Sequence, residues 1–169
     1  MAIIVRPATT EDFAVAGRIC VQAYRADGQL GEHGYETELA DVAGRAAHGE
    51  VLVAVDEDTG EVLGCVTFVL PGSAYAELSR DGEAEFRMLA VAPEAQGRGA
   101  GEALARACLD RAEQAGASAV VICTRDFAHT AQRLYARLGF QRLPERDWEP
   151  YPGVKLLALR RELPVRSVA

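Results

Sequence analysis

The alternation of apolar and polar positions predicts that the chain opens with a strand followed by a helix. Residues 3–6 form a short apolar run that Pro7 closes, which is typical of a strand. A helix is expected to start with Glu11 and Asp12, and apolar side chains then recur at helical spacing from residue 13 to residue 23. Thr9 or Thr10 precedes this pattern and can cap the helix.

The middle of the chain predicts a weak helix, a hairpin and a further strand. A glycine-rich break precedes a weakly amphipathic pattern over residues 35–47, which favours a second helix. Two apolar runs, 51–55 and 62–70, flank an acidic turn that contains Gly60, as in a β-hairpin. After a polar, loop-like stretch, a fourth strand is expected over residues 84–91.

The C-terminal part predicts helices that alternate with strands. One helical stripe runs from residue 100 to 115, and the wholly apolar run 119–123 is typical of a strand buried on both faces. A short helix is expected over residues 131–138 and a last strand over residues 154–163. A short strand at 140–143 is an option between them.

This order of elements predicts a mixed α/β fold, closer to α+β than to a doubly wound sheet. The hairpins indicate antiparallel pairing, whereas the strand–helix–strand passage from residue 84 to 123 indicates a parallel pair with a right-handed crossover. The 169 residues suit one domain with a sizeable core, and the sequence has no internal repeat or long linker. We therefore predict a single domain over residues 1–169.

The composition disfavours nucleic acid and membranes as partners. The formal net charge is −7, and an acidic chain repels phosphate backbones, whereas an acidic surface tolerates a cationic amine. No apolar stretch reaches the roughly 18 to 20 residues that cross a bilayer. The first residues carry their positive charge after the apolar ones, which is the wrong order for a signal peptide. We therefore expect a cytoplasmic protein.

The cysteines and histidines predict no metal centre. Cys20, Cys65, Cys108 and Cys123 form no CxxC pair, and each lies in an apolar run, so we interpret them as reduced core thiols. The histidines lack metal-ligand spacing to one another or to the cysteines. A nucleophilic role for Cys123 has no support from any His–Asp arrangement in the sequence.

The stretch AEFRMLAVAPEAQGRGAG, residues 84–101, combines a strand, a glycine-rich turn and a helix start. Free N–H groups and the partial positive charge of a helix N-terminus attract phosphate, and Arg98 adds a full charge. This pattern favours a phosphate or diphosphate site over a plain tight turn. A Walker A loop needs a lysine that is missing here, and a dinucleotide GxGxxG pattern fails because Glu102 or Leu104 replaces its last glycine.

This stretch resembles the acetyl-CoA-binding motif [QR]-x-x-G-x-[GA] of the GNAT superfamily of N-acetyltransferases, through Gln96, Gly99 and Gly101. AQRLYARLGF at residues 131–140 resembles the family's second motif, and residues 3–13 resemble its first strand and helix. The order of elements also agrees, so the resemblance covers nearly the whole chain.

The resemblance implies a mainly antiparallel sheet, flanked by helices and splayed between the fourth and fifth strands, where the pantetheine arm of acetyl-CoA inserts. It also implies direct attack of an amine on the thioester in a ternary complex, with no metal and no acyl-enzyme. The cofactor-binding residues that it implies are Leu89, Ala90, Val91, Gln96, Gly97, Arg98, Gly99, Ala100 and Gly101.

The resemblance further suggests two catalytic residues. Glu85 stands where several such enzymes carry a general base, with Glu83, a water chain or a merely solvated carboxylate as alternatives. Tyr135 stands where the family carries the acid for the departing thiolate, with a core tyrosine as the alternative. Strand alternation puts Glu85 on the face of Leu89 and Val91, unless a bulge reverses that relation.

One departure concerns the second motif. Many relatives carry an asparagine where this chain has Ala128, so a cofactor hydrogen bond or a helix cap is lost or replaced, with Asp126 and Thr130 as candidate replacements. This departure affects the details of pantetheine binding and leaves the class of protein unchanged.

The acceptor remains open at the level of sequence. Residues 24–35, 72–85 and 147–151 are expected to build its pocket, and the aromatic and acidic side chains among them suit a cationic small-molecule, peptide or protein amine. The alternative function is a non-catalytic acyl-CoA-binding or sensor domain. A homodimer that pairs through the last strand is a further option.

Overall fold

The structure is a computed structural model that describes residues 2–30 and 34–164. The chain forms two compact units, each described by itself below. The first unit contains the residues up to Phe68 together with Arg87–Cys108, and the second contains Val69–Phe86 together with the residues from Leu109. The single domain over residues 1–169 stays a prediction.

The described residues confirm the predicted mixed α/β class. The strands are β1 (Ile3–Pro7), β2 (Glu50–Asp56), β3 (Val62–Val69), β4 (Glu83–Val91), β5 (Ala119–Arg125), β6 (Gln141–Arg142), β7 (Trp148–Tyr151) and β8 (Val154–Glu162). They follow the order β1-β2-β3-β4-β5-β8-β6 in a mostly antiparallel sheet, and β7 pairs with β8. The pairing of β4 with β5 is parallel, as the strand–helix–strand pattern predicts. The expected splay between them stays a prediction.

Helices flank the sheet. The α-helices are α1 (Phe13–Ala26), α2 (Tyr35–Ala40), α3 (Val42–His48), α4 (Ala100–Gln114) and α5 (His129–Arg137). Three single turns of 3₁₀ helix, η1 (Thr10–Asp12), η2 (Pro93–Ala95) and η3 (Pro144–Arg146), link other elements.

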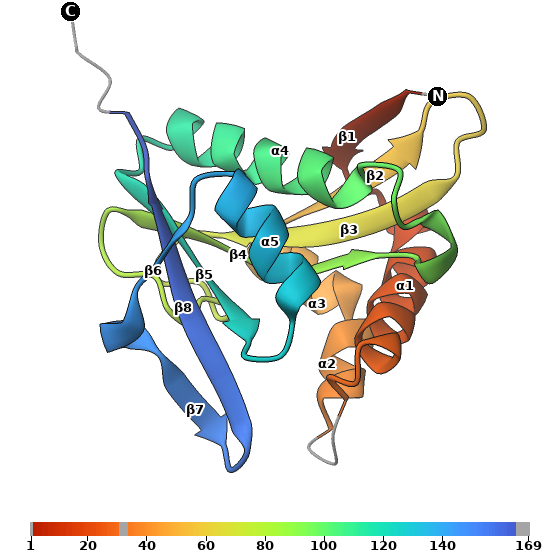
Figure 1. Cartoon of the computed structure of the whole chain (residues 1–169). Helices are drawn as coiled ribbons and strands as arrows, with labels where there is room; N and C mark the ends of the chain where they lie inside the picture. Colours follow the sequence, from red (N-terminus) through yellow and green to blue (C-terminus); the bar gives the residue numbers. More distant parts are fainter. Residues whose placement is uncertain (1, 31–33, 165–169) are drawn as a thin grey trace, which may run out of the picture. The chain divides into compact units, whose positions relative to one another are not determined.

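The first unit is built on the antiparallel strands β1, β2 and β3, which lie side by side in Figure 1. The predicted hairpin is confirmed, and Leu52, Val53 and Ala54 in its first strand are completely buried. On β3, a Cβ added to Gly64 would lie 2.6 Å from the carbonyl oxygen of Ala90 on β4. Only glycine therefore lets these two backbones approach so closely.

The prediction of one helix over residues 35–47 is wrong, because Asp41 divides that segment. Asp41 has a non-helical backbone conformation (φ −85°, ψ 70°), and its Oδ1 accepts a hydrogen bond from the amide of Gly44 at 3.0 Å. An aspartate that caps a new helix start in this way competes with continuation of the previous helix. Two short helices, α2 and α3, result.

The start of the first helix is later than predicted. Residues 10–12 form the 3₁₀ turn η1, and α1 begins at Phe13. Asp12 Oδ2 accepts hydrogen bonds from the Thr9 amide at 2.8 Å and from Arg6 Nη1 at 2.7 Å. The hydrogen bond from Arg6 and those from Thr9 outweigh burial and lower the pKa of Asp12 to about 2.

The second unit is built on β5 and β8, which pair antiparallel from Ala119↔Glu162 to Arg125↔Leu156. Figure 1 shows β7 and β8 as a hairpin, which turns at Pro152 and Gly153. Strand β7 was not predicted from the sequence because residues 148–151, WEPY, contain a proline and no alternation of apolar and polar positions.

Candidate active site

The glycine-rich stretch connects β4 to α4 in the first unit. The 3₁₀ turn η2 follows β4, and α4 begins at Ala100. Its first intrahelical hydrogen bond runs from the Ala103 amide to the Gly99 carbonyl at 3.0 Å. The amides of Ala100, Gly101 and Glu102 therefore precede the internal ladder of the helix, where they are available to a ligand.

Gly97 and Gly99 require glycine for their backbone conformation. Their φ angles are +81° and +90°, in a region that other residues adopt only under strain. A Cβ added at either position would meet no atom within 4 Å, so open space surrounds both. Gln96, Gly97 and Gly99 are exposed, which leaves this loop accessible to a phosphate group.

Arg98 is tied to the protein rather than extended into solvent. Its Nη2 donates to Asp56 Oδ2 at 2.7 Å, and Asp56 also accepts the amide of Asp58 at 2.9 Å in the β2–β3 turn. This ion pair attaches the glycine loop to the end of β2. The sequence pattern identified Arg98 as a charge but gave no sign of its partner, which lies 42 positions away.

An irregularity interrupts β4 just before the expected pantetheine strand. Met88 has a φ of +56°, the one positive value among the described residues other than glycine. Such a conformation within a strand marks a bulge and disturbs the regular alternation of side chains. The alternative in which a bulge changes the facial relation of Glu85 to Leu89 and Val91 is therefore favoured over simple alternation.

Glu85 belongs to the second unit and is completely buried. Its Oε1 accepts hydrogen bonds from the amides of Glu77, Leu78 and Ser79 at 3.1, 3.1 and 3.0 Å. A carboxylate that accepts consecutive backbone N–H groups holds that backbone segment in place. The observed surroundings of Glu85 are those of an anchor for the loop 77–79, and the alternative of a merely solvated carboxylate does not apply.

Glu83, the alternative base, is paired with Arg146 of η3. Nη1 and Nη2 of Arg146 contact its two carboxylate oxygens at 2.9 and 3.0 Å, and Nη2 also donates to the carbonyl of Leu78. Burial raises the pKa of Glu83, but the hydrogen bonds from Arg146 and from the amide of Arg80 outweigh it, so the pKa lies below its ordinary value. This pairing makes Glu83 a weak base.

Tyr135 of α5 is fixed by aromatic packing in the second unit. Its ring lies 5.9 Å from that of Phe86 and 5.8 Å from that of Phe140, both in edge-on arrangements, and Phe86 and Phe140 contact each other at 6.1 Å. The side chain is 7% exposed. These contacts hold the ring rigidly, which suits a positioned acid as well as a core residue.

The start of α5 is tied to the loop before it by a side chain inside the helix. Ala128 provides no side-chain cap, and the Nε2 of Gln132 donates to the carbonyls of Arg125 and Asp126 at 3.0 and 3.2 Å. The replacement of the asparagine by Asp126 or Thr130 stays a prediction. Gln132 was not predicted from the sequence because it lies inside the helix, after the loop that it contacts.

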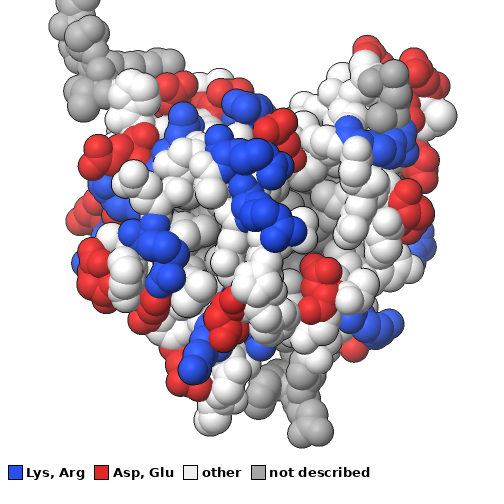
Figure 2. Space-filling view, viewed as in Figure 1, with Lys and Arg blue, Asp and Glu red and all other residues white. Residues whose placement is uncertain are grey.

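The charge of α5 differs from the acidic total of the chain. Arg133 and Arg137 are exposed on this helix, and Figure 2 shows basic side chains gathered over the region of α5, with acidic ones scattered around them. The net charge of −7 therefore does not describe every part of the surface.

The predicted acceptor segments are only partly described. Residues 31–33 lie outside the described residues, while Tyr24 and Tyr35 on either side of them contact each other with ring centroids 5.9 Å apart. In the second unit Trp148 Nε1 donates to Cys123 Sγ at 3.4 Å. This contact favours the interpretation of Cys123 as a packed thiol over its interpretation as a nucleophile.

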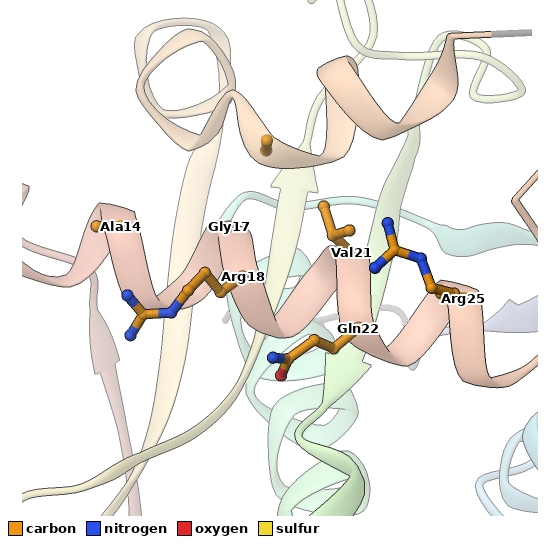
Figure 3. Close-up of a pocket in the computed structure, with 7 residues that line it drawn as sticks. Ala14, Gly17, Arg18, Val21, Gln22 and Arg25 are labelled. Carbon is orange, nitrogen blue, oxygen red and sulfur yellow. The ribbon is translucent and has the colours of Figure 1, made fainter.

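The hollow shown in Figure 3 is a separate feature of the first unit. It measures about 300 Å³ and lies along α1, where Val21 and Arg25 are directed toward the neighbouring helical segment. None of its lining residues is a predicted catalytic or cofactor-binding residue. They are Ala14, Gly17, Arg18, Val21, Gln22, Arg25 and Ala40.

In the part of the chain that the structure describes, no group of three or more His, Cys, Asp and Glu residues is arranged to hold a metal ion. Likewise, no described helix combines the length and the apolar character that crossing a membrane requires.

The arrangement of strand, glycine loop and helix defines the class of protein. Residues 18–140 match the model of the acetyltransferase (GNAT) family, and the chain belongs to that family. An uncharacterized N-acetyltransferase of Schizosaccharomyces pombe is 34% identical over 112 residues, which are 66% of this chain and 64% of that protein. The match thus spans less than two thirds of the length of that relative.

Solved structures agree on the fold. A protein of Corynebacterium glutamicum, described as histone acetyltransferase HPA2 and related acetyltransferase, is 25% identical with a TM-score of 0.75 over 99% of this chain and 100% of its own. The PaiA N-acetyltransferase of Thermoplasma acidophilum, solved with coenzyme A, is 13% identical with a TM-score of 0.70 over 96% of this chain and 100% of its own. The acyl-CoA N-acyltransferase fold predicted from the sequence is confirmed.

Proposed function

We propose that the protein transfers the acetyl group of acetyl-CoA to a primary amine, which attacks the thioester directly in a ternary complex. The observation that carries this proposal is the open glycine loop at the start of α4, in a chain that belongs to the acetyltransferase (GNAT) family. The acceptor is a small-molecule amine or an amine of a peptide or protein. The proposal includes a homodimer that pairs through the last strand.

The residues of the first unit fit a CoA pyrophosphate. Gly97 and Gly99 present backbone without a Cβ to open space, and the helix that follows presents free amides in its first turn. We infer that Gln96 to Gly101, including Arg98 and Ala100, hold the pyrophosphate, and that the backbone of Leu89, Ala90 and Val91 pairs with the pantetheine arm. Acetyl-CoA would supply the activated acetyl thioester.

Tyr135 is proposed as the acid that protonates the departing thiolate. Its ring is fixed by Phe86 and Phe140, so little conformational freedom is lost when the hydroxyl acts. Glu85 is proposed as the base that accepts the proton of the amine, directly or through water. Its three amide hydrogen bonds support a second role as an anchor of the loop 77–79, and the two roles are separable by experiment.

The first test is thermal melting of the purified protein with acetyl-CoA, CoA or NAD. A ligand at about 100 times its Kd adds about 2.7 kcal/mol of stability, which raises the Tm by roughly 5 to 10 °C. We expect this shift with acetyl-CoA and CoA and none with NAD. The absence of a shift with any CoA ester would overturn the assignment of the loop.

The second test separates transfer from mere binding. An amine panel that includes polyamines, amino acids and N-terminal peptides is incubated with acetyl-CoA, and the released thiol is measured. An acetyltransferase releases thiol with at least one acceptor, and Tyr135→Phe slows that release. Binding of acetyl-CoA without acetyl transfer to any acceptor would instead favour the sensor domain.

A further inference from the structure

A completely buried arginine occupies the core of the first unit. Arg45 of α3 is 0% exposed, whereas arginine side chains normally reach solvent. Its Nε donates to Thr67 Oγ1 at 3.0 Å, and its Nη1 donates to the carbonyls of Leu39 and Glu38 at 2.7 and 2.9 Å. None of the partners that the described residues offer to this cation is a carboxylate.

The remaining partner of Arg45 is a sulfur atom. Arg45 Nη2 lies 3.5 Å from Cys20 Sγ, and Cys20 Sγ lies 3.2 Å from Cys65 Sγ. Both cysteines are buried, at 0% and 1% exposure, and they come from α1 and β3. Cys65 Sγ also lies 3.7 Å from the carbonyl oxygen of Ala16. Two thiols and one guanidinium thus share a single dry site.

Charge balance distinguishes the two cysteines. A buried cation without an anionic partner is costly, and a Cys20 thiolate would provide that partner. The hydrogen bond from Cys65 lowers the pKa of Cys20, burial opposes this effect, and the charge of Arg45 lowers the pKa further. The same hydrogen bond, together with burial, raises the pKa of Cys65. Cys20, the sulfur that Arg45 contacts, is therefore assigned as the nucleophile of the pair.

We propose that Cys20 and Cys65 form a peroxide-sensitive dithiol that closes reversibly to a disulfide beside Arg45. The two sulfurs lie 3.2 Å apart, so they need to approach by about 1 Å to reach the bonding distance of roughly 2.05 Å. Arg45, which contacts Cys20 Sγ, is a cation that stabilises a thiolate, unlike the purely apolar surroundings in which a buried cysteine is inert.

The reaction balances with hydrogen peroxide as the oxidant. The Cys20 thiolate attacks one peroxide oxygen, the O–O bond breaks, and the leaving hydroxide takes a proton to become water. Cys65 then attacks the sulfur of the Cys20 sulfenic acid, an S–S bond forms, and a second water leaves. Two sulfurs are oxidised and two oxygens are reduced. An external dithiol then reduces the disulfide and restores the two thiols.

Peroxide reaches the pair through local opening of the fold. Arg45 of α3 donates to the carbonyls of Glu38 and Leu39 at the end of α2. The helices α2 and α3 have only six and seven residues. Such short helices open at a low free-energy cost. Oxidation removes the negative charge that faces Arg45. Because Arg45 belongs to α3 and donates to carbonyls of α2, we expect these two helices to be less stable in the disulfide state.

The test uses the full chain and its two other cysteines as internal controls. Cys108 is as deeply buried as Cys20, and Cys123 is the most accessible thiol of the four. The native protein is treated with increasing hydrogen peroxide, quenched with an alkylating agent and mapped by mass spectrometry. We expect the Cys20–Cys65 disulfide to form at least about tenfold faster than any modification of Cys108.

Two variants sharpen the outcome. In Cys65→Ala the sulfenic acid at Cys20 has no partner, so a diketone that traps sulfenic acids is expected to label Cys20. Cys108→Ser leaves the pair intact and keeps the disulfide. Oxidation of Cys123 while Cys20 and Cys65 remain reduced in the native chain would overturn the proposal, as would a disulfide between any other two cysteines. These readouts do not depend on the proposed acetyl transfer.

Discussion

The glycine loop of the first unit and the base of β4 in the second treat backbone amides in opposite ways. Around Gly97 and Gly99 the chain leaves open space next to the first amides of α4. Around Glu85 three consecutive amides are already bound by a buried carboxylate. The first arrangement leaves room for an incoming anion next to its amides, whereas the amides of the second already bind the carboxylate of Glu85.

This difference shows that a motif alone does not determine the role of a residue. Both segments match the family pattern, and only the loop has the open surroundings that its predicted role needs. Glu85 stands at the position of a base and yet has the partners of a structural anchor. Substitutions in both segments test this contrast.

The largest effect is expected for Tyr135→Phe. Loss of an acid positioned at the leaving group costs roughly 100- to 10,000-fold in kcat. The ring contacts with Phe86 and Phe140 survive, so the Tm and the Kd for acetyl-CoA should change little. Steady-state kinetics with a good acceptor measure kcat, and thermal melting measures stability. An unchanged kcat together with a lowered Tm would mean that Tyr135 is a core residue only.

The glycine loop predicts a binding effect for Gly99→Ala, with Gly116→Ala as its matched control. Both glycines have a positive φ, +90° and +76°, and both face open space, so their backbone strain is comparable. We expect both variants to lose about 1 kcal/mol of stability. Only Gly99→Ala should weaken acetyl-CoA binding, by about tenfold or more. Calorimetric titration measures the Kd, and equal Kd values in both variants would contradict the loop assignment.

Glu85→Gln separates the base from the anchor. The amide that replaces one oxygen cannot accept the Glu77, Leu78 and Ser79 amides as the carboxylate does, which costs about 1–3 kcal/mol of stability. An anchor predicts a lower Tm and a raised KM. A base predicts a lower kcat that recovers at high pH, with little change in Tm. Asp58→Asn, in an exposed turn, controls for the loss of a charge.

The smallest effect is a pH dependence from Asp12 in the first unit. Its pKa of about 2 in the fold lies below the ordinary value of 3.8. The stabilisation is therefore complete above pH 3.8 and is lost as the pH falls toward 2. Denaturant melts between these values should show a smaller acid loss in Asp12→Asn than in the original chain. An identical pH profile would remove Asp12 from the account of acid stability.

The elements that were predicted well from the sequence are those marked by apolar runs and turn residues that lie close together along the chain. The β2–β3 hairpin has two apolar runs around an acidic turn, and this pattern requires no knowledge of distant residues. Elements whose boundary depends on one side-chain contact were missed or misplaced. The break at Asp41 and the shifted start of α1 at Phe13 each arise from an aspartate that binds a nearby amide.

The residues of the candidate site show the same difference between local and distant signals. Gln96, Gly99 and Gly101 and the surroundings of Tyr135 stand out because fixed spacing along the chain carries the motif. The partners of Arg98, Glu85 and Arg45 do not stand out, because Asp56, the amides of residues 77–79 and Cys20 come from other elements. Spacing along a sequence contains no information about which distant groups share a buried volume.

Patterns along the chain were enough to predict the class of fold, the family and the position of the glycine loop, because periodicity, turn residues and motif spacing are local properties. The surroundings of individual side chains became visible only in the folded structure. Folding made Glu85 an anchored carboxylate, tied Arg98 to Asp56 and enclosed Arg45 with two thiols. The physical reason is that burial and hydrogen bonding determine the charge state and freedom of a side chain, and both depend on neighbours that only folding brings together.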